Sequence, residues 1–83
     1  MTEDTLQDLA ERAALLASLP QAEIRAKVRR ELGVTVTELA ALVGTTRTTI
    51  RRIEAGESIP TGEMLVALSR FYDAAGGRYV AAA

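Results

Sequence analysis

Residues 35–56 read TVTELAALVGTTRTTIRRIEAG, a stretch that predicts two short helices joined by a tight turn. Thr35 is followed three residues later by Glu38, which is the spacing of a capping box at the start of a helix. Gly44 falls where the first helix needs a left-handed residue to end. Thr45 or Thr46 can then cap the second helix. We therefore expect helices over residues 35–43 and 46–55.

The second of these helices has one apolar stripe, made by Ile50 and Ile53. Its other faces carry guanidinium and hydroxyl groups, from Arg47, Thr48, Thr49, Arg51 and Arg52. Two capped helices across a glycine turn, with the second presenting cations and hydroxyls, are typical of a helix-turn-helix that binds DNA. The sequence therefore predicts a small DNA-binding regulator.

The composition indicates one small all-α domain. The chain has 83 residues, of which 48% are hydrophobic and only 4% aromatic. A core of that size built from Leu, Ile, Val and Ala suits packed helices better than sheets. Glycine and proline lie mainly between the apolar segments, which leaves four or five short helices.

The residue types also exclude several kinds of function. The chain has no cysteine and no histidine, which excludes disulfides, zinc sites and histidine general-base chemistry. We expect no enzyme and no cofactor, because the hydroxyl groups have no histidine to activate them. No membrane span and no signal peptide is predicted, so the expected location is cytoplasmic. No second domain is large enough to bind a small-molecule effector, and none is expected.

Charge is distributed unevenly along the chain. The formal net charge is −1, but residues 20–60 hold seven cations against five anions, whereas residues 1–19 hold four anions against one cation. The positive charge therefore lies in the segment that carries the two predicted helices. This pattern favours contact with DNA and predicts modest non-specific affinity, because that affinity scales with the phosphates neutralised.

Three segments are predicted from the breaks in the pattern: an amphipathic helix in residues 1–19, a DNA-binding domain in residues 20–75, and a tail or short strand in residues 76–83. The first helix has an apolar stripe of Leu6, Leu9, Ala13 and Leu16. We expect this stripe to pack on the rest of the domain. Its spacing is also compatible with a dimer seam or a contact with a partner protein.

Two further helices complete the predicted bundle. Residues 21–32 place Ile24, Val28 and Leu32 on one face, and Gly33 ends that helix. Thr61 is expected to cap a helix that runs to Gly76-Gly77.

Residues 20–75 resemble the Cro/phage-repressor type of helix-turn-helix, also called the xenobiotic-response-element family. The matching residues occur in the family's order and spacing: Arg29, Gly33, Glu38-Leu39-Ala40, Val43-Gly44-Thr45-Thr46, Ile50, Ile53-Glu54, Gly56 and Pro60. The resemblance implies a lambda-repressor-like bundle whose recognition helix begins near Thr46 and enters the major groove. It further implies a phage or bacterial transcription regulator, most simply a repressor, that binds an inverted-repeat operator as a homodimer.

The resemblance also implies roles for individual residues. Arg47, Thr48 and Arg52 fall where such repressors contact base edges. Hydroxyl and cationic groups fall where phosphate is contacted, at Thr46, Thr49, Arg51 and Thr37. Arg29 and Glu54 are expected to form a structural ion pair. For the arginines the alternative is a solvated helix face, and for Thr46 it is an N-cap alone.

Two departures from the family pattern predict weaker DNA binding. Val36 stands where glutamine often contacts phosphate, and Glu57 stands where a basic residue often follows the recognition helix. Residues 68–80 also look like the tail of HigA-like antitoxins. Two alternatives therefore stay open: an antitoxin that represses its own operon, and a protein-interaction module that has lost DNA binding.

Overall fold

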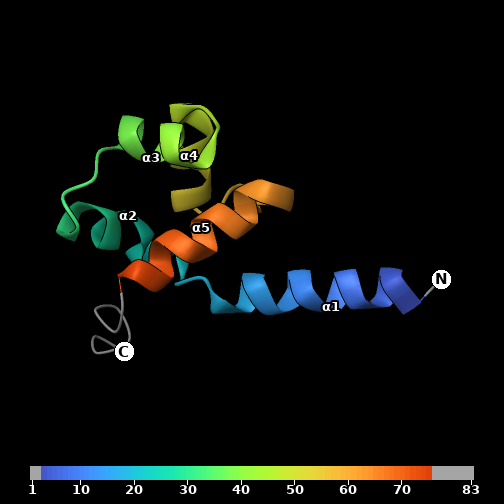
Figure 1. Cartoon of the computed structure of the whole chain (residues 1–83). Helices are drawn as coiled ribbons and strands as arrows, with labels where there is room; N and C mark the ends of the chain where they lie inside the picture. The colour runs from blue at the N-terminus through green and yellow to red at the C-terminus, as the bar shows by residue number, and fades with distance from the viewer. Residues whose placement is uncertain (1–2, 76–83) are drawn as a thin grey trace.

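The computed structural model describes residues 3–75 and contains five helices in that range (Figure 1). They are α1 (Glu3–Ser18), α2 (Ala22–Glu31), α3 (Val36–Val43), α4 (Arg47–Glu54) and α5 (Gly62–Ala74). No strand occurs within residues 3–75, so the all-α prediction is confirmed. The tail or strand predicted for residues 76–83 lies outside the described residues.

The core of the bundle is made by α2 to α5. Its most deeply buried side chains are aliphatic apart from one tyrosine, and they include Leu39, Ile50, Ile53, Leu65, Leu68 and Tyr72. Burying one large aliphatic side chain contributes about 1.5–3 kcal/mol. Phe71 packs edge-on against Tyr72, with ring centroids 5.3 Å apart. The aromatic side chains within residues 3–75 thus lie together on α5, against an otherwise aliphatic core.

Of the three helix caps that the sequence predicts, two are present and one is not. The capping box at Thr35 is confirmed: the Glu38 N–H donates to the Thr35 hydroxyl at 3.0 Å, and the Thr35 N–H donates to the Glu38 carboxylate at 3.0 Å. The hydrogen bond from the Thr35 N–H to the carboxylate is the main reason why the pKa of Glu38 is lowered. Thr61 occupies the N-cap position of α5 but makes no side-chain cap, so this expectation is wrong. The chain enters α5 through Gly62 at φ +58°, outside the helical geometry that a side-chain cap needs.

The first helix packs on the bundle only through its last turns. Figure 1 shows α1 running along one side of the bundle, with its N-terminal part extending beyond α5. Leu19 is buried and Leu15 and Leu16 pack against the core, while the Ser18 and Ser69 hydroxyls lie 3.4 Å apart. Leu6 and Leu9, in contrast, are 55% and 39% exposed.

The expectation that the apolar stripe packs on the domain is therefore wrong for Leu6, Leu9 and Ala13, which are exposed, and is right only for Leu16. The physical reason is that α1 contacts the core through its own last turns, so that no helix covers its earlier turns. Across the described part of the chain, no helix is both long enough and apolar enough to span a membrane.

Candidate nucleic-acid interface

The turn between α3 and α4 sets the angle between these two helices. Gly44 has φ +80°, the left-handed conformation that glycine adopts at little cost, and its N–H donates to the Ala40 carbonyl at 2.9 Å. The Thr45 N–H donates to the same carbonyl at 2.9 Å. Thr46 follows as the N-cap of α4, and its hydroxyl accepts the Thr49 N–H at 3.2 Å. The predicted helix-turn-helix is therefore present, with both ends of its turn hydrogen-bonded.

One side of α4 faces the core, and the opposite side faces solvent. Ile50 and Ile53 are fully buried. The 3.6-residue period of the helix then directs the opposite side chains outward. We call this exposed strip the outer face of α4; it consists of Arg47, Thr48, Arg51 and Arg52.

The outer face of α4 is positively charged and unneutralised. Within residues 3–75, none of its three arginines forms an ion pair. The acidic residue of the helix, Glu54, has a buried side chain that is turned toward α2. Three cations on eight residues of helix give a local positive potential that the net charge of −1 conceals.

The threonines predicted to contact phosphate have different surroundings. Thr46 caps α4 and also donates its hydroxyl hydrogen to the Thr49 hydroxyl at 3.0 Å. Thr49 is half-buried, and because its oxygen accepts that bond, its own hydrogen points elsewhere. Thr37 lies exposed in the first turn of α3. N-capping is therefore the role that the structure gives Thr46.

An ion pair fastens the end of α4 to α2. Arg29 Nε lies 2.6 Å from Glu54 Oε2, and Arg29 Nη2 donates to Glu54 Oε1 at 3.2 Å. A third bond runs from Arg29 Nη1 to the Val34 carbonyl at 2.9 Å. The two side chains are only 9% and 8% exposed. A two-pronged, buried arginine–carboxylate pair of this kind fixes orientation as well as distance.

A second arginine on α2 also holds α4, and the sequence reasoning missed it. Arg25 donates from Nε to the Pro20 carbonyl at 2.8 Å and from Nη1 to the Ile53 carbonyl at 2.7 Å. Its guanidinium thus joins the α1–α2 connection to the last turn of α4. The available signal was its position one turn before Arg29 on the same face of α2.

A buried tyrosine lies beneath this cluster of charges. Tyr72 is 1% exposed, and among the described residues its hydroxyl has no hydrogen-bond partner. The pKa of Tyr72 is raised to about 12, mainly by burial and also by the charge of Glu54, while Arg25 and Arg29 oppose the shift.

The two positions that depart from the family pattern have clear structural surroundings. Val36 packs half-buried against the core, so this position contributes apolar contact. Glu57 is exposed directly after α4, and its N–H donates to the Arg52 carbonyl at 2.8 Å. Gly56, directly before Glu57, has φ +77°, and a Cβ at this position would lie 3.1 Å from the Ala22 Cβ.

A family model described as helix-turn-helix matches residues 26–75, which is more than half of the chain. The chain belongs to this family, of the Cro and lambda-repressor type. It is accordingly a DNA-binding regulator of the xenobiotic-response-element type. The match covers α3 to α5 and most of α2, and leaves α1 outside. No curated protein and no solved structure matches the chain.

Proposed function

We propose that this helix-turn-helix protein is a sequence-specific transcriptional regulator that binds an inverted-repeat operator as a homodimer and represses its own operon. The observation that carries the proposal is the outer face of α4, with three unpaired arginines on the second helix of the motif. Such a role places the protein with bacterial or phage DNA in the cytoplasm.

Specific contacts are assigned by position along α4. Arg47 and Thr48 lie in its first turn, and Arg52 lies one turn further on the same face. An arginine can donate two hydrogen bonds to guanine O6 and N7, while threonine offers a methyl group to thymine and a hydroxyl to other bases. These three residues are the proposed base contacts.

The phosphate contacts are assigned to other hydroxyl and cationic groups on and around the same surface. Arg51 is the cation among them, and Thr37, Thr46 and Thr49 supply hydroxyl groups. Contacts of this kind fix register on the duplex without reading sequence. With one such cation per subunit and Glu57 nearby, we expect modest non-specific binding.

Rigid attachment of α4 favours high affinity for the operator. Arg29 and Arg25 together hold the last turn of α4, through Glu54 and the Ile53 carbonyl. A recognition helix fixed in this way loses little conformational freedom when it enters the groove, so more of the contact energy appears as affinity.

The test is to select bound fragments from the source genome with the full chain, and to follow the winning fragment against salt. The proposal predicts an inverted repeat near the chain's own gene, with half-sites about one helical turn (roughly 34 Å) apart. No enrichment from a protein shown to be folded would overturn it. Enrichment of one unrepeated site would refute the homodimer and leave the DNA-reading role intact.

A further inference from the structure

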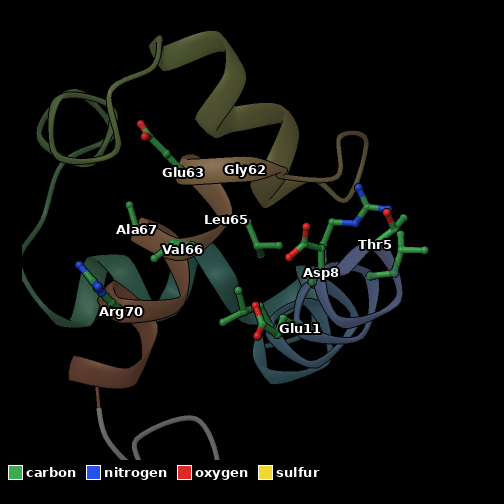
Figure 2. A pocket seen from close by; sticks show the side chains of 12 residues that line it. Thr5, Asp8, Glu11, Gly62, Glu63, Leu65, Val66, Ala67 and Arg70 are labelled. Atoms are coloured by element: carbon green, nitrogen blue, oxygen red, sulfur yellow. The ribbon is translucent and has the colours of Figure 1, made fainter. Parts of the chain in front are cut away.

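An open cleft lies between α1 and the first turns of α5 (Figure 2). Its volume is about 750 Å³. Its apolar lining comes from both helices and includes Leu9, Leu15, Leu65, Val66 and Ala67. We call this feature the α1–α5 cleft.

The cleft exposes apolar surface that the single chain leaves uncovered. Leu9 is 39% exposed and Val66 is 37% exposed, on opposite walls of the cleft. Leu6, three residues before Leu9 on α1, is more exposed still. Since the family match begins at residue 26, α1 is an addition to the matched domain rather than a part of it.

Three charged residues of α1 line the cleft: Asp8, Glu11 and Arg12. Glu11 accepts a hydrogen bond from the Gln7 amide at 3.3 Å, whereas Asp8 and Arg12 lie one helical turn apart on the same face. Within residues 3–75 neither forms an ion pair, although their spacing allows one within the helix. Each is therefore available to a charge from outside the chain.

We propose that the α1–α5 cleft binds α1 of a second copy of this chain, with the two α1 helices antiparallel about a two-fold axis that crosses α1 at the level of Ala10, on the face that carries Asp8 and Arg12. This interface supplies the dimer on which the proposed function rests. A two-fold contact uses one patch twice, so the patch must complement itself. The cleft offers an apolar groove, and the projecting first half of α1 offers the exposed leucines to fill it.

Charge selects the antiparallel arrangement. With the axis near Ala10, Asp8 of each copy lies opposite Arg12 of the other, which gives two ion pairs. A parallel arrangement would place Asp8 against Asp8 and Arg12 against Arg12. Like charges directly opposed are unfavourable, so the parallel form is rejected.

The experiment is sedimentation equilibrium of the full chain without DNA, across micromolar concentrations. The proposal predicts a mass that rises from 8.9 kDa toward twice that value. Asp8→Arg and Arg12→Asp, made singly, should each weaken the dimer by at least about tenfold, because each opposes like charges at two symmetric sites. The double variant restores both ion pairs with reversed polarity and should recover the dimer.

Further variants separate the cleft from other surfaces. Val66→Lys places a charge on the α5 wall and should also give monomers. Ile59→Lys is the matched control, because Ile59 is exposed but does not line the cleft. Circular dichroism and thermal unfolding of each variant show that it is folded.

Two results would overturn the proposal. A chain that stays monomeric at every concentration leaves the cleft to a different protein, and a dimer that ignores both the charge reversals and Val66→Lys uses another surface. Failure here is distinguishable from failure of the proposed function. A monomer that still binds one half-site through Arg47 refutes this interface while keeping DNA recognition.

Discussion

Replacing Arg29 by methionine removes the guanidinium that holds α4 on α2, while keeping an unbranched side chain. The change deletes the two hydrogen bonds to Glu54 and the bond to the Val34 carbonyl. It leaves Glu54 with a side chain only 8% exposed and without its partner. Removing one member of a buried pair typically costs about 3–5 kcal/mol.

That loss is large for a protein of this size. A domain of 83 residues has a free energy of unfolding of roughly 4–12 kcal/mol, at about 0.05–0.15 kcal/mol per residue. Arg29→Met should therefore lose a quarter or more of the total. Urea denaturation followed by circular dichroism measures it, as a lower midpoint with an unchanged slope.

Two matched variants sharpen the test. Arg29→Met combined with Glu54→Leu removes both charges and should recover much of the loss, because no uncompensated charge stays buried. Arg30→Met, at the exposed neighbour on α2, should stay within about 0.5 kcal/mol of the parent. A loss below about 1 kcal/mol in Arg29→Met would match an exposed pair and contradict a stabilising role for buried Arg29. A double variant no more stable than the single one would do the same.

Three further predictions follow from the buried tyrosine, the glycine turns and the outer face of α4. Tyr72→Phe should match or exceed the parent in stability at neutral pH, because the lost hydroxyl has no partner among the described residues. The pKa of Tyr72 is 10.0 in the unfolded chain and about 12 in the folded chain. Between these values the free energy of unfolding of the parent should therefore fall by roughly 1.4 kcal/mol per pH unit, whereas that of the variant should not. Urea midpoints at about pH 8 and about pH 11 check both statements, and a parallel fall in the two proteins would contradict them. Gly56→Ala should be more destabilising than Gly44→Ala in thermal unfolding, since both positions have positive φ but only Gly56 approaches Ala22 closely; equal losses would mean that the close approach is relieved. Arg51→Ala should weaken binding similarly on all DNA sequences and reduce the salt slope by about 1 per half-site, and sequence-dependent weakening would make Arg51 a base contact.

The parts of the fold that sequence predicted well depend on neighbouring residues. The capping box at Thr35 and the left-handed turn at Gly44 both follow from residues no more than four positions apart. The burial of Ile50 and Ile53 follows from helical periodicity, and with it the exposure of the opposite face. The Arg29–Glu54 pair spans a longer separation and was expected only from the family resemblance.

The parts that sequence missed depend on tertiary placement. Arg25 bonds to two backbone carbonyls, and backbone atoms carry no residue-specific signal in the sequence. The stripe on α1 correctly indicated an amphipathic helix, but periodicity does not say which neighbour covers each turn. Thr61 lost its expected cap because of the backbone at Gly62, which a residue type alone does not fix.

DNA reading by α4 is tested by measuring the affinity of the parent and of Arg47→Ala for the selected operator and for each of its single-base-pair variants, at one salt concentration. If Arg47 reads a base from the outer face of α4, the substitution costs about 1–3 kcal/mol on the operator and removes preference at one position per half-site, while preferences elsewhere persist. An equal loss on every sequence would make Arg47 a phosphate contact. No loss at all would mean that α4 is not the recognition helix.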